Sequence, residues 1–450
     1  MNTRKEIFIR LLKIAHLFLS VLIFAFAWKE YRIVNSIDIA FRYDLFVYAM
    51  FGVLMYFFCR TYNAYLIEYQ TPGDIVFSLC LSSGISTMGV YILTLVAWNK
   101  FHSPGVFLLA VLAQFLFNAV WAVAVVKIYY HINKPLATIV IYRNQADLRR
   151  LSDIRRYEKK YTVVRYLEDP QQIEETIRAI EECEAGAVFL AGVNATLRNG
   201  IAKYCIEKGI PGFFLPHVGD VILAGGQHVQ AFSVPIMSIQ RSSNPPEYLF
   251  LKRMVDILVS SLAIVLTSPF MLITALAIRL YDHGPALYRQ VRLTKDRREF
   301  AILKFRSMRV DAEKDGIARL STGEKDPRIT PVGRVIRAIR FDELPQLFNI
   351  LKGDMTLVGP RPERPELAAE YEKEMPAFSL RLQVKAGLTG YAQVYGKYNT
   401  DPYDKLEMDL MYINRMNIFL DIQIMFATLR ILFKKDSTSG IEEGKTNAMT

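Results

Sequence analysis

The chain has 450 residues, of which 52% are hydrophobic and 22% are charged, and its formal net charge is +11. At about 150 residues per domain, this length predicts roughly three units. Long stretches that carry almost no charge exclude a disordered, collagen-like or fully water-soluble chain. We therefore expect a membrane protein with soluble parts.

Charge separates the middle of the chain from its two ends. Residues 136–250 hold 13 basic and 13 acidic side chains, whereas residues 1–135 hold 11 and 6 and residues 251–450 hold 31 and 25. Basic segments beside apolar ones favour contact with anionic membrane lipids, and the arginines of the last third favour a phosphate-bearing substrate. Because the cations lie next to hydrophobic segments, no nucleic acid is expected as a partner.

Four apolar runs lie within residues 1–135, and each is within reach of the roughly 20 residues that a bilayer-spanning helix needs. They are Ile14–Trp28, Leu45–Cys59, Ile75–Trp98 and Val106–Tyr130. These runs predict a bundle of four transmembrane helices. The basic residues ahead of the first run favour a cytoplasmic N-terminus, whereas Lys29, Arg32 and Arg42 in the next loop favour the opposite orientation.

Residues 136–240 alternate short β-branched or apolar runs with helical segments. The runs TIVIYR, YTVVRYL, AGAVFLAGV and GFFLP predict buried parallel strands. This pattern is typical of a small Rossmann-like α/β domain. The loop after the first strand, Arg143–Gln145, lacks the GxGxxG glycines that allow a pyrophosphate to approach the backbone. We expect this domain to be regulatory or structural.

A polar linker over residues 241–253 leads to an apolar run over residues 254–280. Ser268-Pro269 interrupts this run, and a proline inside a helix removes a backbone hydrogen bond and kinks the helix. If the soluble regions before and after the run face the same side of the membrane, the run cannot cross it. We therefore predict a re-entrant kinked helix. The alternative is a fifth transmembrane span with an ordinary proline kink.

Residues 281–435 are predicted to form the last soluble domain, followed by a mobile tail over residues 436–450. Within this domain, Ile418–Phe433 has a wide apolar surface that is broken by Asp421, Gln423 and Arg430. This pattern fits an interfacial helix at the membrane surface. It fits a buried helix of the last domain equally well.

Cations surround an adjacent pair of acids, Asp342-Glu343, in this last domain. The basic residues are Arg289, Arg292, Lys304, Arg306, Arg334, Arg337, Arg340, Arg361, Arg364 and Lys385. Arginine forks bind phosphate oxygens bidentately, so the cluster suits a substrate with several phosphates. The helical pattern LPQLFNIL that follows predicts Asp342 near an N-cap and Glu343 in the first turn. Phosphoryl transfer needs a nucleophile, charge neutralisation and usually Mg²⁺.

Three contiguous motifs in this region resemble the bacterial sugar transferase family, the polyprenyl-phosphate hexose-1-phosphate transferases that start exopolysaccharide or O-antigen assembly. The motifs are KFRSM (304–308), VGRVIRAIRFDELPQLFNILKGDMTLVGPRP (332–362) and VKAGLTGYAQV (384–394). The similarity covers about residues 248–435, and the preceding spans and α/β domain resemble the long form of these enzymes. The expected fold class is a membrane α-helical bundle plus α/β, with a mainly helical catalytic domain anchored by a re-entrant kinked helix.

The resemblance implies a role for each matching residue. Asp342 matches the nucleophile that attacks the β-phosphorus of a UDP-sugar and releases UMP, and Glu343 matches its partner in the catalytic dyad. Mg²⁺ is expected at Asp342. Arg337 matches the position that holds the polyprenyl phosphate. Three residues fall in motifs that line the nucleotide-sugar pocket: Lys304, Arg306 and Arg361.

The resemblance implies that this chain transfers a hexose 1-phosphate to undecaprenyl phosphate. We expect the hexose to be glucose or galactose rather than an N-acetylated sugar. The resemblance also implies a catalytic domain on the cytoplasmic face of the bacterial inner membrane, and a homodimer is compatible with it. Two departures from the family pattern are the turn Thr294–Arg297, where glycines are usual, and Arg340, where a small hydroxyl residue is usual. Two other functions stay open: a membrane glycosyltransferase that releases UDP, and a non-catalytic membrane scaffold or sensor.

Overall fold

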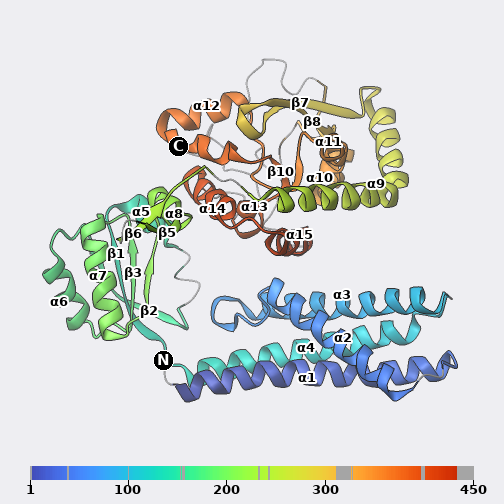
Figure 1. Ribbon diagram of the computed structural model, residues 1–450, viewed down its shortest axis with the longest axis horizontal. Helices are drawn as coiled ribbons and strands as arrows, with labels where there is room; N and C mark the ends of the chain where they lie inside the picture. Colours follow the sequence, from blue (N-terminus) through green and yellow to red (C-terminus); the bar gives the residue numbers. More distant parts are fainter. Residues whose placement is uncertain are drawn as a thin grey trace. The chain divides into compact units, whose positions relative to one another are not determined.

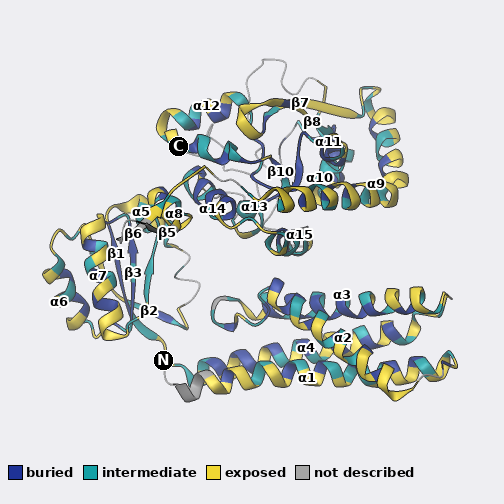
Figure 2. Cartoon of the chain, in the orientation of Figure 1, coloured by how far each residue is buried: buried dark blue, intermediate teal, exposed yellow. Residues whose placement is uncertain are grey.

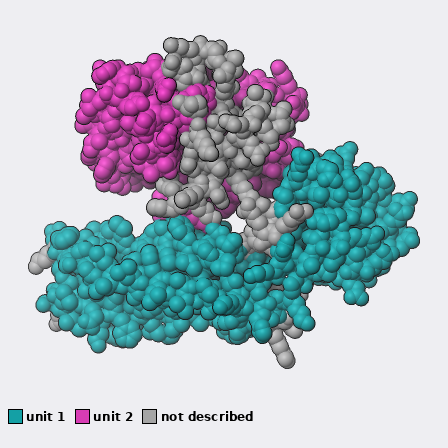
Figure 3. Space-filling model, turned by 180° about the vertical axis from the view of Figure 1, so that it is seen from behind, with its two compact units in different colours: residues 1–215 teal, residues 216–450 magenta. Residues whose placement is uncertain are grey.

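The chain divides into two compact units, residues 1–215 and residues 216–450, which Figure 3 colours separately. The computed structural model describes residues 3–432 except 38–39, 100, 153, 155–157, 232–233, 242–243, 311–325, 327 and 397–400. The predicted mobile tail over residues 436–450 lies outside the described residues.

The first unit begins with four long helices (Figure 1). They are α1 (Thr3–Val34), α2 (Phe41–Thr61), α3 (Pro72–Trp98) and α4 (Gly105–Ile132), with a short 3-10 turn η1 (Ile67–Tyr69) between α2 and α3. Each of the four apolar runs predicted from the sequence lies within one of these helices. Among the described residues, five helices are long and apolar enough to cross a membrane, these four and α9 of the second unit. The chain is therefore membrane-anchored.

Polar side chains inside the bundle bond to one another across helices. The ring of His16 on α1 lies 3.0 Å from the amide oxygen of Asn118 on α4 and 3.0 Å from the hydroxyl of Tyr65. The amide nitrogen of Asn118 donates to the hydroxyl of Ser83 on α3 at 3.1 Å. Polar groups in an apolar bundle need such partners because water is excluded there. These contacts fix which faces of α1, α3 and α4 meet.

A four-stranded parallel sheet follows the bundle, in the order β2-β1-β3-β4. Its strands are β1 (Leu136–Tyr142), β2 (Tyr161–Glu168), β3 (Ala187–Ala191) and β4 (Gly212–Phe214), and its helices are α5 (Gln145–Arg150), α6 (Ile173–Glu182) and α7 (Ala195–Lys208). The two central strands are buried on both faces, and their buried residues include Ile139, Val140, Ile141, Val188 and Leu190. Figure 2 shows these strands as the buried layer beneath the helices. The predicted parallel α/β sheet is confirmed.

The second unit opens with α8 (Val218–Ala224) and an antiparallel hairpin, β5 (Gln227–Ala231) and β6 (Val234–Ser238). Helix α8 packs on α14 (Pro402–Asn414): the amide of Asn414 donates to the Val221 carbonyl at 2.8 Å. Val218 and Val221 are buried in the core of this unit. The last helix of the region that the sequence assigns to the α/β domain thus contributes to the core of the second unit.

Helix α9 (Pro246–Asp282) contains Pro269, and Figure 1 draws it as two arms that meet at a sharp bend. Proline has no N–H, so Pro269 leaves the carbonyl of Val265 without its helical donor. The hydroxyl of Ser268 donates to this carbonyl instead, at 2.9 Å. Large apolar side chains of α9 are exposed along both arms; they include Leu258, Leu262, Leu266, Leu272 and Leu276. Figure 2 colours exposed residues of both arms yellow.

The first arm of α9 is tied to the second unit by three charged residues. Lys252 donates to Asp421 of α15 (Ile418–Leu432) at 2.8 Å. Arg253 donates to the carbonyls of residues 350 and 351, at 2.6 and 2.7 Å, and so caps the end of α11 (Gln346–Lys352). Asp256 accepts from the hydroxyl of Thr356 at 2.8 Å. These three charges on an otherwise apolar helix are therefore held by protein partners.

The rest of the second unit is mainly helical, with two small sheets. Its helices and 3-10 turns are η3 (Lys295–Arg297), α10 (Pro331–Ala338), η4 (Phe341–Glu343), α12 (Pro365–Glu374), η5 (Pro376–Gln383) and α13 (Tyr391–Tyr395). The sheets are antiparallel β7 (Leu287–Leu293) with β8 (Glu299–Phe305), and parallel β9 (Thr356–Val358) with β10 (Gly387–Thr389). Helix α15 buries Asp421 and Ile424 and exposes Phe419.

Candidate active site

The two adjacent acids lie on η4, a short turn between α10 and α11. The prediction that Asp342 lies near an N-cap and Glu343 in the first turn of the next helix is wrong, since the N-cap of α11 is Pro345. Pro345 has no N–H and cannot donate to the Phe341 carbonyl four residues earlier, so this carbonyl needs another donor. The N–H of Leu344 bonds to the Phe341 carbonyl instead, at 3.2 Å, and closes a separate 3-10 turn.

Three cations hold the carboxylate of Glu343. Its Oε1 accepts from Lys304 Nζ at 3.3 Å and from Arg361 Nη2 at 3.1 Å, and Arg340 Nη1 lies 3.9 Å away. Burial alone would raise the pKa of Glu343, but the charges of Arg361, Lys304 and Arg340 outweigh burial and hold the pKa well below its usual range. Glu343 is therefore a permanent anion near neutral pH.

The adjacent Asp342 has the opposite electrostatic environment. Burial and the negative charge of Glu343 raise the pKa of Asp342 to about 6, although Lys304, Arg337 and Arg340 act against the rise. Two neighbouring carboxylates whose pKa values are driven apart are a common arrangement at catalytic sites. The turn thus presents one fixed anion beside one carboxylate that titrates close to neutrality.

The cations reach the acids from separate elements that are packed firmly together. Lys304 lies on β8, where the amide of Asn349 donates to the Ala301 carbonyl at 2.8 Å and its oxygen accepts from the Leu303 N–H at 2.9 Å. Arg337 lies on α10, which follows an N-cap formed by Thr330. Burial lowers the pKa of Lys304, although Glu343 opposes this effect.

Arg306 is placed differently from the other predicted substrate-binding residues. Its guanidinium makes a two-pronged ion pair with Asp282, the last residue of α9, and donates to the Pro285 carbonyl at 2.8 Å. Only 6% of its surface is exposed. These contacts tie the end of β8 to the end of α9. Lys304, Arg337 and Arg361 are brought to the acid pair, and the substrate-binding role of Arg306 stays a prediction.

Arg361 belongs to an irregular segment, residues 359–364, that leaves the end of β9. The segment begins where β9 and β10 approach closely: a Cβ added at Gly359 would lie 2.5 Å from the Lys385 carbonyl oxygen, and one added at Gly387 would lie 2.1 Å from the Gly359 nitrogen. Both distances are shorter than van der Waals contact allows, so these positions require glycine. The close approach sets where the segment starts.

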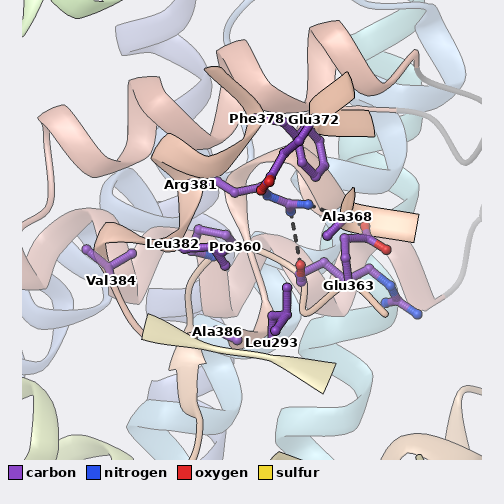
Figure 4. A pocket seen from close by; sticks show the side chains of 11 residues that line it. Leu293, Pro360, Glu363, Ala368, Glu372, Phe378, Arg381, Leu382, Val384 and Ala386 are labelled. Atoms are coloured by element: carbon purple, nitrogen blue, oxygen red, sulfur yellow. Dashed lines mark hydrogen bonds and ion pairs between the residues drawn. The ribbon is translucent and has the colours of Figure 1, made fainter. Parts of the chain in front are cut away.

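A small cavity lies behind this segment (Figure 4). It is lined by Leu293, Pro360, Arg361, Glu363, Ala368, Glu372, Phe378, Arg381, Leu382, Val384 and Ala386. Arg381 enters it from η5 and is buried. Sequence reasoning missed Arg381, because its sequence neighbours Leu380 and Leu382 give no sign of a site.

Arg340, one of the two departures from the family pattern, has a left-handed backbone with φ 57° directly before the acid pair. It contributes a cation to both acids. The other departure, the turn Thr294–Arg297, has left-handed backbone at Asp296 (φ 57°) and Arg297 (φ 60°). Glycine adopts this conformation without strain, which explains why glycines suit the turn. Thr294 is buried there, and its hydroxyl donates to the Asp354 carbonyl at 3.1 Å.

No group of three or more histidine, cysteine or acidic side chains that would enclose a metal occurs among the described residues. Mg²⁺ does not need such a cage, because it is usually bound by one or two carboxylates together with waters and substrate phosphates. Asp342 and Glu343 provide two adjacent carboxylates. Their chemistry therefore fits a Mg²⁺ ion that arrives with a phosphate-bearing substrate.

The family model described as "Bacterial sugar transferase" matches residues 247–435. A relative from Aeromonas hydrophila, a UDP-N-acetylgalactosamine-undecaprenyl-phosphate N-acetylgalactosaminephosphotransferase, is 45% identical over 57% of this chain and 62% of its own length. UDP-glucose:undecaprenyl-phosphate glucose-1-phosphate transferases from Klebsiella pneumoniae and Caulobacter vibrioides are 36% and 38% identical, over 48% and 41% of this chain.

The similarity reaches different shares of these relatives. The chain spans 62% of the Aeromonas relative, 47% of the Klebsiella relative and 71% of the Caulobacter relative. The family match contains all but the first residue of α9, together with the acid pair, the cations around it and the segment with Arg361. The chain is thus a member of the bacterial sugar transferase family.

Proposed function

We propose that this protein transfers a sugar 1-phosphate from a UDP-sugar to undecaprenyl phosphate through a covalent intermediate on Asp342. The observation that carries the proposal is the acid pair itself. A carboxylate that titrates near neutrality lies beside a fixed anion, and four cations from separate parts of the second unit surround the pair. An ionised Asp342 is a nucleophile, and the cations match the charge of a diphosphate.

In the first step the Asp342 carboxylate attacks the β-phosphorus of the UDP-sugar. A bond forms between the carboxylate oxygen and that phosphorus, and the bond from phosphorus to the bridging oxygen breaks, so UMP leaves with its electron pair. In the second step an oxygen of undecaprenyl phosphate attacks the same phosphorus and frees Asp342. Lys304 and Arg361 neutralise the donor phosphates, and Arg337 holds the acceptor phosphate. Glu343 keeps Lys304 and Arg361 in place.

Asp342, with Glu343 beside it, would hold Mg²⁺. The ion supplies Lewis-acid stabilisation of charge on the diphosphate. The fixed anion of Glu343 adds negative potential that favours a divalent cation. At the same time, the pairs of Glu343 with Lys304 and Arg361 keep those two cations directed toward the phosphates.

The exposed apolar arms of α9 support a re-entrant membrane helix as a further part of the proposal. A helix that enters and leaves by one face would place the acid pair at the membrane surface, where a lipid phosphate and a water-soluble nucleotide sugar both have access. We infer that this face is cytoplasmic, because nucleotide sugars are cytoplasmic substrates. The boundaries 1–135, 136–240, 241–253, 254–280, 281–435 and 436–450 remain our proposed domain division, except that α8 packs with the last domain.

A product assay tests this function. The purified full-length protein, in detergent or lipid, would be incubated with undecaprenyl phosphate, Mg²⁺ and each of UDP-glucose, UDP-galactose and UDP-N-acetylgalactosamine. We expect UMP with one of these donors. UDP as the product would identify a glycosyltransferase that transfers the sugar alone, and no turnover by folded protein on any donor would favour the scaffold or sensor.

A further inference from the structure

A fully buried arginine, Arg381, holds the segment that carries Arg361. Arg381 is 3% exposed. Its Nη2 donates to the Arg361 carbonyl at 3.0 Å, and its Nη1 donates to Glu363 at 3.4 Å. It also forms an ion pair with Asp409 of α14 at 2.6 Å. Figure 4 shows its guanidinium directed across the cavity toward the segment that contains Glu363.

The contact matters because residues 360–363 have no helix or strand to fix them. Instead, four successive carbonyls accept from donors elsewhere in the unit. The Pro360 carbonyl accepts from the Gly387 N–H at 2.9 Å and the Glu363 carbonyl from the Leu293 N–H at 3.0 Å. The two carbonyls between them accept from arginine side chains, Arg361 from Arg381 at 3.0 Å and Pro362 from Arg292 at 3.1 Å.

Arg381 is also fixed on its far side, so it can act as a rigid support. Burial works against its charge, but the carboxylates of Asp409 and Glu363 raise its pKa above the usual value. Its guanidinium carbon lies 4.8 Å from the centre of the Phe378 ring. A planar fork held by two carboxylates and a ring has one orientation available, which a flexible lysine would not reproduce.

We propose that Arg381 is a positioning residue, which sets the place of Arg361 against Glu343 by holding the Arg361 carbonyl. The chain of contacts runs from Asp409 through Arg381 to the backbone of residue 361, whose side chain reaches Glu343 at 3.1 Å. Its effect on turnover rests on the proposed function. The effect of Arg381 on the position of the segment does not depend on the proposed function.

The test uses three full-length variants and a matched control. Arg381→Lys keeps the charge and removes the fork, and Asp409→Asn removes its anchoring carboxylate. Arg361→Ala removes the side chain that is positioned. The control is Asn414→Ala, on the same helix as Asp409, which loses a contact with α8 but touches neither Arg381 nor the segment.

We expect Arg381→Lys and Asp409→Asn each to lower kcat/KM for UMP release about 10- to 100-fold, because small misplacements of a positioning group cost this much. Hydrogen exchange should accelerate in peptides that cover residues 356–368 and stay unchanged in β8. The double variant Arg361→Ala with Arg381→Lys should be no less active than Arg361→Ala alone, since both act through one group. Asn414→Ala should keep its kcat/KM and its exchange in residues 356–368.

Unchanged exchange in folded Arg381→Lys would overturn the inference, and so would fully additive losses in the double variant. If neither Arg381→Lys nor Asp409→Asn folds, Arg381 only stabilises the core, and the inference is also wrong. Absence of UMP release by the unaltered protein would instead refute the proposed function, while the exchange measurement would still report on the segment.

Discussion

The sheet of the first unit and the catalytic region of the second unit differ in how deeply they bury charged side chains. The ion pair that joins β2 to α6, Arg165 with Glu182, is solvent-exposed, with 43% and 67% of the two side chains accessible. In the second unit, Arg381 and Asp409 are 4% and 1% accessible, and Glu343 is 14% accessible. The sheet is stabilised by apolar burial, whereas the catalytic region buries several charges.

Burying charge usually costs more free energy than the resulting ion pair returns. A fold that needed only stability would keep charge at its surface, as the sheet does. We therefore expect the buried charges around the acid pair, Glu343 and the Arg381–Asp409 pair, to position chemistry. The following predictions test this contrast, from the largest expected effect to the smallest.

Asp342→Asn should lower turnover by about 10⁴- to 10⁶-fold, as loss of a nucleophile typically does. The same change should stabilise the protein at pH 7.5. The pKa of Asp342 in the folded state, about 6, lies above its ordinary value of 3.8, so its favourable contribution to stability is lost as pH rises through 6. A neutral amide removes that penalty, about 3 kcal/mol. Product analysis measures the loss of turnover, and thermal unfolding measures the change in stability. A lower melting temperature for Asp342→Asn would contradict the raised pKa of Asp342.

Glu343→Gln should reduce turnover less, about 10²- to 10⁴-fold, because the nucleophile remains. Its effect on stability should be the reverse of Asp342→Asn. The pKa of Glu343 is held low by cations, so its contribution to stability is present above its ordinary value of 4.5 and is lost only at lower pH. At pH 7.5 the amide leaves Lys304 and Arg361 without their anion and should cost about 1–3 kcal/mol. A covalent sugar-phosphate adduct mapped to Glu343 would show that Glu343, not Asp342, is the nucleophile.

The boundary of the second unit can be tested by truncation. A chain that starts at Pro216 keeps α8, whereas a chain that starts at Pro246 lacks it. The shorter chain loses Val218 and Val221 and exposes the core residues that these valines cover. Two buried valines contribute about 3 kcal/mol in total. The shorter chain should therefore unfold at a lower temperature in detergent, with UMP release retained by both below that temperature. Equal melting temperatures would show that α8 is not part of this core.

The pH profile should report the carboxylate with the raised pKa. Below the Asp342 pKa of about 6, kcat/KM should fall about tenfold for each pH unit, because a protonated carboxyl is a poor nucleophile. Above that pH the profile should level off. Measurements from pH 5 to 8 in buffers of constant ionic strength would show the limb. If kcat/KM begins to fall only near the ordinary aspartate pKa, the group that titrates is not Asp342.

Arg165→Gln provides the weakest expected effect. The residue lies in an exposed ion pair on the sheet, and such pairs contribute within about 1 kcal/mol. Stability and UMP release should both stay close to those of the unaltered protein. A large loss of turnover would reveal a functional link from the sheet to the acid pair.

Patterns that depend on near neighbours in sequence could be read without a structure. The apolar runs, the parallel strands and the adjacency of Asp342 and Glu343 are of this kind, and so is the kink at Pro269. The pairing of Arg306 with Asp282 and the contact of Arg381 with residue 361 join residues about 20 positions apart, and no local period encodes them. The same holds for α8, whose partner α14 lies far along the chain.

The close approach at Gly359 and Gly387 also bears on how the family can diversify. Any side chain at these two positions would collide with backbone atoms, so the start of the Arg361 segment is closed to substitution. Variation in the preferred sugar must then arise from residues whose side chains have room to change. A comparison of related chains with different donors should find these two glycines shared, and the differences concentrated in the surrounding side chains.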